Sequence, residues 1–376
     1  MKPQTLEREG ASPAPKPPRK RLIPPPEKLR AAGLEAAISL LAFVLSIVTG
    51  GIILAILGVN PFTAYAALFQ GALGSPSAIG GTINRMIPII LAGLAVAVGQ
   101  KGSVFNIGVE GQLIVGGLLG CLAGIYIPAP AALHLPICML ASMLGGLLWA
   151  LIPAWLRLKK NVGEVFTTIM FNYVAKFLLG YLVVKVFVNA GGQLSATEKI
   201  RDSARLPALV AKPYNINVGI LVAVLAVVLV AIFIQKTRWG YEMRATGYNR
   251  DASSSAGINV GRNMFLALLL SGALAGLGGC LEINGTVFRV FESYSPGYGA
   301  TGIAVALLAK NNPVAVLLTA FLFGAMRNGA ALMQMSTGVS SEFVSIVQGL
   351  IIIFVCSENF IRYLLKKAQK RGVKYA

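Results

Sequence analysis

Residues 34–57 read LEAAISLLAFVLSIVTGGIILAIL, and this run of 24 residues sets the class of the protein. As an α-helix the run would be roughly 36 Å long, which exceeds the hydrocarbon core of a bilayer at about 30 Å. It is also too long for the apolar region of a signal peptide. We therefore interpret it as an uncleaved first membrane span.

The rest of the chain has the same character. Of its 376 residues 56% are hydrophobic and only 12% are charged, with a mean hydropathy of +0.72, whereas soluble domains carry about 25% charged residues. Further apolar runs occupy residues 83–98, 105–127, 131–156, 165–188, 218–234, 264–283, 299–309, 313–332 and 343–360. We predict an all-α polytopic membrane protein with about ten transmembrane segments. They include short or broken helices, because 299–309 is too short to cross alone; residues 61–74 are expected to form an interfacial helix.

The positions of the basic residues predict the topology. Eight of the 33 lysines and arginines lie in the Pro-rich residues 1–30, and others gather at 157–160, at 236–262 and after 361. Short cytoplasmic loops carry the excess of Lys and Arg, and counting crossings then places both termini in the cytoplasm. We expect a disordered basic tail at 1–30, a transmembrane domain at 31–365 and a basic cytoplasmic tail at 366–376. The net charge of +19 is thus explained without a nucleic-acid partner.

Several kinds of chemistry are excluded. His134 is the only histidine, and the four cysteines form no CxxC pair, so we predict no metal site, no catalytic residues and no cofactor. The chain contains no Gly-Lys dipeptide, and therefore it cannot hold the phosphate-binding loop of an ATPase. We expect that it is not an enzyme and that any ATP dependence comes from another subunit.

Four polar side chains stand out within apolar regions: Asn106, Glu110, Gln112 and Asn172. Polar groups are costly in lipid and usually have a partner or a function. Asn106 could cap the following helix, and Glu110 would then lie near the N-terminus of that helix. Glu110 could be a structural acid, part of a solute pathway or a proton-coupling group. Asn172 requires a hydrogen-bond partner, which could be a neighbouring helix or a solute.

The polar stretch 237–263 is too polar to cross the membrane and too long for a simple turn. Short helices are expected at 241–245 and 251–256, with Asp251 able to cap the second. Such a surface element could dock into a groove on a cytoplasmic partner, or it could be an ordinary solvated loop.

Taken together, five stretches resemble one family of permeases. They are FNIGVEGQ (105–112), NVGEVFTTIMFNYVA (161–175), DASSSAGINVGR (251–262), SGALAGLGG (271–279) and GIAVALLAKNNPVAV (302–316). The chain resembles the membrane subunit of bacterial ABC importers for simple sugars and nucleosides, a group related to the branched-chain amino-acid permeases. These motifs resemble those of the nucleoside branch more than those of the sugar branch, although Gly163 stands where nucleoside members often have Asn.

The resemblance implies a permease in the bacterial plasma (inner) membrane. Its implied partners are a second permease subunit, copy or paralogue, a cytoplasmic ABC ATPase, an extracytoplasmic solute-binding protein and the lipid bilayer. It also implies that Arg244, Gly247, Asn249, Ala256 and Gly257 couple the chain to the ATPase. The segment with Asn106, Glu110 and Gln112 resembles the start of a pore-side helix, and we add Asn172 to this predicted translocation pathway.

Nucleosides are the expected solutes, and a simple sugar such as ribose or galactose is the alternative. A second alternative is an ion-coupled secondary transporter that uses Glu110, Glu282 or another intramembrane acid.

Overall fold

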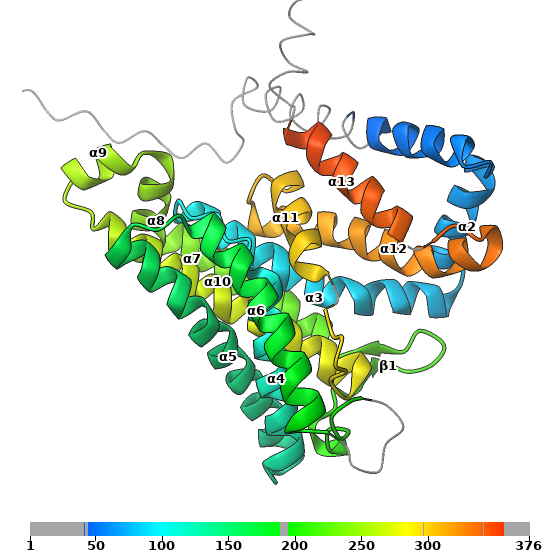
Figure 1. Cartoon of the computed structure of the whole chain (residues 1–376), viewed down its shortest axis with the longest axis horizontal. Helices are drawn as coiled ribbons and strands as arrows, with labels where there is room; N and C mark the ends of the chain where they lie inside the picture. Colours follow the sequence, from blue (N-terminus) through cyan, green and yellow to red (C-terminus); the bar gives the residue numbers. More distant parts are fainter. Residues whose placement is uncertain (1–40, 42–43, 189–194, 296, 341, 357–376) are drawn as a thin grey trace, which may run out of the picture.

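The computed structural model describes residues 41, 44–188, 195–295, 297–340 and 342–356. The predicted tails at 1–30 and 366–376 lie outside these residues. The described chain is built almost entirely of helices, with one short hairpin of two strands (Figure 1).

A helix at Val44–Ile56 comes first. The elements that follow are α2 (Pro61–Leu73), α3 (Pro76–Lys101), α4 (Val109–Tyr126), α5 (Ala131–Lys160), α6 (Glu164–Lys185), a 3₁₀ turn η1 (Asp202–Ala204), β1 (Ala208–Val210), β2 (Ile216–Asn217), α7 (Gly219–Lys236), α8 (Arg238–Tyr248), α9 (Arg250–Ser255), α10 (Val260–Glu282), a π-helical segment η2 (Ile283–Val287), α11 (Tyr298–Leu308), α12 (Pro313–Thr337) and α13 (Glu342–Cys356).

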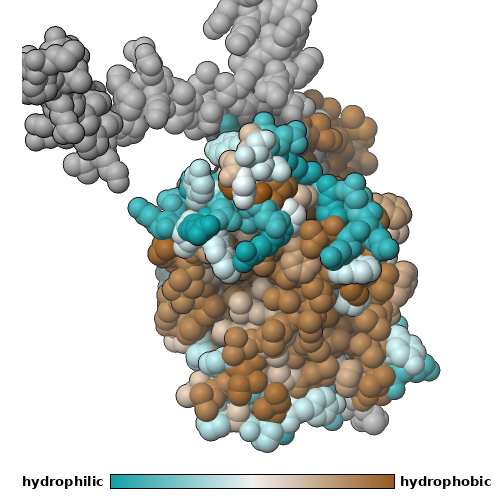
Figure 2. All heavy atoms as spheres, turned by 90° about the vertical axis from the view of Figure 1, so that its left-hand side faces the viewer, coloured by the Kyte–Doolittle hydropathy of each residue, from teal (hydrophilic) through white to brown (hydrophobic). Residues whose placement is uncertain are grey.

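Seven of the described helices are long and apolar enough to cross a membrane. They are α3, α4, α5, α6, α7, α10 with η2, and α12, while Val44–Ile56, α11 and Glu342–Phe354 are shorter apolar helices. Figure 2 shows the matching surface, a hydrophobic band between a strongly hydrophilic upper end and a paler lower end. The prediction of an all-α polytopic membrane protein is confirmed. The number of ten crossing segments and the cytoplasmic position of the termini stay predictions.

Three helices begin with the same local signal. Asn60, Ser75 and Asn312 each cap a helix whose first residue is proline, and each side chain accepts a hydrogen bond from a backbone N–H of the first turn. Proline suits this position because its missing N–H would have no partner there. The cap at Ser75 explains why α3 starts at Pro76 rather than at residue 83, where the apolar run begins.

Glycines bring α4, α5 and α10 into close contact. A Cβ on Gly116 of α4 would collide with the backbone of Gly276 in α10, and a Cβ on Gly146 of α5 would collide with the carbonyl of Gly272. Gly272 and Gly276 form a GxxxG pattern, which lets helix backbones approach within a membrane. Ser142 of α5 adds a hydrogen bond to the carbonyl of Gly116 at 2.6 Å.

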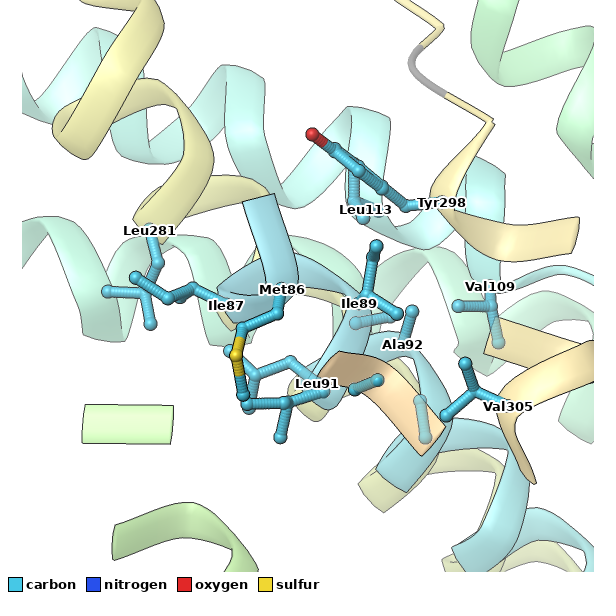
Figure 3. Packing of buried hydrophobic residues seen from close by; sticks show 14 of the residues in the cluster. Met86, Ile87, Ile89, Leu91, Ala92, Val109, Leu113, Leu281, Tyr298 and Val305 are labelled. Atoms are coloured by element: carbon cyan, nitrogen blue, oxygen red, sulfur yellow. The ribbon is translucent and has the colours of Figure 1, made fainter. Parts of the chain in front are cut away.

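Helix α3 lies at the centre of the fold and packs against α10, α11, α12 and α7. Its residues Ile87, Ile89 and Leu91 are at most 1% exposed, and Figure 3 shows them among side chains of α4, α10 and α11. The two ends of α3 reach different structures. The first half meets Asn215 and Asn217 beside the β1–β2 hairpin, and the last turn meets α8.

Candidate functional site

The start of α4 is held by a side chain from α6. Asn172 accepts a hydrogen bond from the Gly111 N–H at 2.8 Å and donates to the Ile107 carbonyl at 2.9 Å. The first N–H groups of a helix have no partner within that helix, and Asn172 satisfies one of them from a neighbouring span. The sequence left open whether Asn172 bonds to a neighbouring helix or to a solute. In the structure it bonds to the backbone at the start of α4.

Glu110 performs the same role for a different helix. Its Oε1 accepts hydrogen bonds from Ser295 Oγ at 3.1 Å and from the Gly297 N–H at 2.8 Å, and its Oε2 accepts from the Gly299 N–H at 2.6 Å. The half-buried carboxylate therefore closes the N-terminus of the short helix α11, where a negative charge is favourable. This contact joins the first turn of α4 to a helix too short to span a membrane alone.

Asn106 and Gln112 form a buried network that reaches α10. Asn106 Nδ2 donates to Gln112 Oε1 and to Ser271 Oγ, both at 2.8 Å, and Ser271 donates to the Ala95 carbonyl of α3 at 2.6 Å. The prediction that Asn106 caps α4 is wrong, because α4 begins at Val109 after Gly108 and has no side-chain cap of its own. Asn106 instead accepts from the Gly108 N–H inside the preceding turn.

The four predicted pathway residues thus lie around the start of α4 and connect it to α6, α10 and α11. A cavity of about 620 Å³ lies beside them, between α3, α11, α12 and α13. Ser295 and Gly297, two of the donors to Glu110, line this cavity, and none of the four predicted residues does. Glu110 thus supports the wall of the cavity through Ser295 and Gly297, whereas other side chains form its surface.

Those other side chains include two arginines within candidate spans, Arg85 of α3 and Arg327 of α12. The Arg327 guanidinium stacks 4.4 Å from the ring centroid of Tyr298, whose hydroxyl donates to Glu282 Oε1 at 2.9 Å. Sequence reasoning singled out neither arginine. The sequence could have identified both arginines, because a charged residue inside an apolar run is costly in lipid and often has a function. The same argument selected Asn172.

Helices α8 and α9 form a separate element at the opposite end of the molecule from the β1–β2 hairpin (Figure 1). Thr237 caps α8 by accepting from the Gly240 N–H at 3.0 Å. Asn249 caps α9 by accepting from the Ala252 N–H at 3.0 Å, so the expectation that Asp251 is the cap is wrong. The two short helices occur where the sequence predicted them, as α8 (Arg238–Tyr248) and α9 (Arg250–Ser255).

This element is fixed to the last turn of α3. A Cβ on Gly247 would collide with the carbonyl of Lys101, so α8 and the end of α3 approach backbone to backbone. Arg250 Nε donates to Ser103 Oγ at 2.7 Å, and a second nitrogen of Arg250 donates to the Ser103 carbonyl. A displacement of α8 and α9 would therefore act directly on α3.

The predicted coupling residues divide into two groups. Arg244 is half-buried and Gly247 packs its backbone against Lys101, although Gly247 itself is exposed. Asn249, Ala256 and Gly257 are exposed and, within the described chain, have no such contact with α3. Gly257 has a φ of +79° and allows the chain to turn after α9. The sequence did not single out Tyr248, which ends α8 and is 88% exposed.

Among the described residues no group of three or more His, Cys, Asp or Glu side chains could hold a metal ion.

Comparison with known proteins agrees with this architecture. Residues 78–356 match the family described as "Branched-chain amino acid transport system / permease component". The guanosine ABC transporter permease protein NupP of Bacillus subtilis is 39% identical over 89% of this chain and 97% of its own length. The glucose ABC transporter permease protein TsgB13 of Haloferax volcanii is 36% identical over 90% and 92%. The nucleoside ABC transporter permease protein NupB of Lactococcus lactis is 35% identical over 89% and 94%.

No solved structure matches the chain significantly. The seven apolar helices and the permease relatives make it a multi-pass protein of the plasma membrane. The match to the family model and the relatives above 30% identity, each covering most of the chain, show that it belongs to the ABC transporter permeases of the branched-chain amino acid transport type.

Proposed function

We propose that this permease forms the translocation pathway of an ABC importer for nucleosides. The observation that carries the substrate class is the 39% identity to a guanosine permease over nearly the whole length of both chains. A nucleoside permease at 35% identity supports the same class. A glucose permease at 36% identity makes a simple sugar the second candidate.

The partners follow from the type of transporter. The chain has no ATPase motif, so a cytoplasmic ABC ATPase supplies the energy, an extracytoplasmic binding protein delivers the solute, and a second permease completes the pathway. The basic residues at 1–30, 236–262 and 366–376 support cytoplasmic termini and a cytoplasmic α8–α9 element. Val44–Ile56, α11 and α13 would add to the seven long spans to give about ten segments.

Coupling runs through the α8–α9 element. ATP binding closes the paired ATPases, the exposed surface of α8 and α9 moves with them, and the contact with α3 transmits the displacement to the spans. The exposed Tyr248, Asn249, Ala256 and Gly257 form the docking surface, while Arg244 and Gly247 fix that surface to the permease. Asn106, Glu110, Gln112 and Asn172 hold the helices that enclose the pathway.

Uptake of radiolabelled nucleosides, in cells that express the permease with its ATPase, binding protein and second permease, tests this function. We expect uptake that is lost when the ATPase's phosphate-binding lysine is substituted. Uptake of ribose, galactose or glucose with the same ATP dependence would leave the ABC role intact and replace the substrate class. Uptake that persists without the ATPase and collapses with an ionophore would support the secondary transporter instead.

A further inference from the structure

Two arginines inside membrane-spanning helices face one polar cavity. Arg85 of α3 and Arg327 of α12 line the 620 Å³ space between α3, α11, α12 and α13. Arginine within a bilayer is costly, and where it occurs it faces a water-filled interior and marks a solute or ion pathway. Gln334 of α12 and Gln348 of α13 add carboxamide groups to the same surface.

The two positive charges are matched by two carboxylates. Glu282 interacts electrostatically with both Arg85 and Arg327 and accepts the hydrogen bond from Tyr298. Glu342 at the start of α13 lines the cavity itself. Glu342 thus lies in the cavity lining with the two guanidinium groups, while Glu282 acts on both of them from outside the lining. Because the two carboxylates offset the two positive charges, the cavity is better suited to a neutral polar solute than to an anion.

The Arg85 side chain is held in position before any solute arrives. Its Nε donates to Asn328 Oδ1 at 3.0 Å, and Asn328 Nδ2 donates in turn to the Gly71 and Ala78 carbonyls at 3.0 and 2.9 Å. The residue is nevertheless exposed, and among the described residues its terminal nitrogens have no hydrogen-bond partner. A fixed guanidinium with unused donors is well placed to bind the acceptor groups of a polar ligand.

We propose that this cavity is the solute-contacting part of the translocation pathway and that it takes a neutral solute rich in hydrogen-bonding groups, of the nucleoside class. Arg85 donates to acceptor atoms of the base, Gln334 and Gln348 exchange hydrogen bonds with base and sugar, and Arg327 on Tyr298 forms a flat wall. The volume lies in the range of about 300–1,000 Å³ of small-molecule sites. This inference rests on the proposed function and names the residues that serve it.

Transport by the complete importer in proteoliposomes tests the proposal. Arg85→Gln keeps a polar side chain and removes the charged donor, and a hydrogen bond to a charged group corresponds to a change of roughly tenfold or more. We expect the rate of nucleoside transport to fall about tenfold while the loaded binding protein still stimulates ATP hydrolysis. The retained stimulation shows that the variant is folded and docked. Arg289→Gln is the matched control, because Arg289 stacks on Phe291 outside the cavity.

The outcomes separate the two proposals. If the wild-type importer does not transport nucleosides, the proposed function is wrong, regardless of the results for the variants. A wild-type importer that transports nucleosides, with equal rates for Arg85→Gln and Arg289→Gln, overturns the assignment of the cavity alone.

Labelling gives a second test that needs no transport. Ser345 lines the cavity and is exposed, so a cysteine at Ser345→Cys should react with a polar thiol reagent and be protected by millimolar nucleoside. Ser254→Cys on the exposed side of α9 should react without protection, and the wild-type chain gives the background from its own cysteines. Protection by inorganic phosphate or by anionic lipid, and not by nucleoside, would make the cavity an anion site and overturn the proposal. Equal labelling of Ser345→Cys with and without nucleoside would overturn it too.

Discussion

Glu110 connects two helices through three hydrogen bonds, and replacing it with glutamine should measure how much that connection contributes. In Glu110→Gln one carboxylate oxygen becomes an NH₂ group. If the remaining oxygen keeps the bonds from Ser295 and Gly297, the new NH₂ group faces the Gly299 N–H, which is also a donor. The variant then loses one charge-assisted bond and weakens two others.

The expected cost follows from these contacts. A hydrogen bond to a charged group contributes about 1.5–3 kcal/mol, and a negative charge at a helix N-terminus adds roughly 0.3–1 kcal/mol. We therefore expect Glu110→Gln to lower the free energy of unfolding by about 2–4 kcal/mol. Because the donors belong to the start of α11, amide exchange should rise first at Gly297 and Gly299.

Thermal unfolding of the purified importer and amide hydrogen exchange provide the assay. The matched control is Glu242→Gln, which breaks only the exposed pair with Arg238 at 3.0 Å and should change stability by about 0.3–0.5 kcal/mol. If Glu110→Gln unfolds at the wild-type temperature with unchanged exchange at Gly297 and Gly299, Glu110 does not stabilise the start of α11. Loss of transport with unchanged stability would instead point to the proton-coupling role.

Asn172→Leu should lower stability by about 1–3 kcal/mol, because the Gly111 N–H and the Ile107 carbonyl lose their partner; unchanged thermal unfolding with impaired transport would indicate contact with solute. Tyr248→Ala should weaken ATPase binding roughly 30-fold, the effect of an interface hot spot of about 2 kcal/mol, as measured by co-purification, while the exposed Tyr181→Ala on α6 should not. Gly276→Leu should destabilise the protein by about 3 kcal/mol or more, because its side chain would enter the backbone of α5 at Ser142 and Gly146; normal yield and stability would contradict the close packing.

The sequence predicts the apolar helices well and their polar ends poorly. Helix α5 begins at Ala131, where its apolar run begins, because Pro130 separates it from the preceding helix. Helix α10 begins at Val260, before the apolar run that starts at 264, because Asn259 caps a polar first turn by accepting from the Arg262 N–H at 2.9 Å. Hydropathy measures transfer into lipid and is insensitive to caps, so polar first turns are assigned to loops.

The partners of the candidate site could not be predicted in this way. The sequence showed that Glu110 and Asn172 needed partners, because a polar group in an apolar region is costly. Which atoms they would meet depends on helix packing, since Ser295 is 185 residues away from Glu110 along the chain. The cavity arises in the same way, from α3, α11, α12 and α13 together, and none of these helices shows it alone.

The proposed coupling surface and the proposed solute cavity share one helix. Helix α3 contacts α8 at its last turn, through Lys101, and presents Arg85 to the cavity nearer its start. Helix α3 has 78% of its apolar window buried, the same share as α10 with η2 and more than the other long spans, so it cannot shift without its neighbours. If α8 and α9 move with the ATPase, α3 is the shortest physical connection to Arg85. Because α11 packs against α3 and Glu110 joins α11 to α4, a shift of α3 would carry these helices with it and change the shape of the cavity.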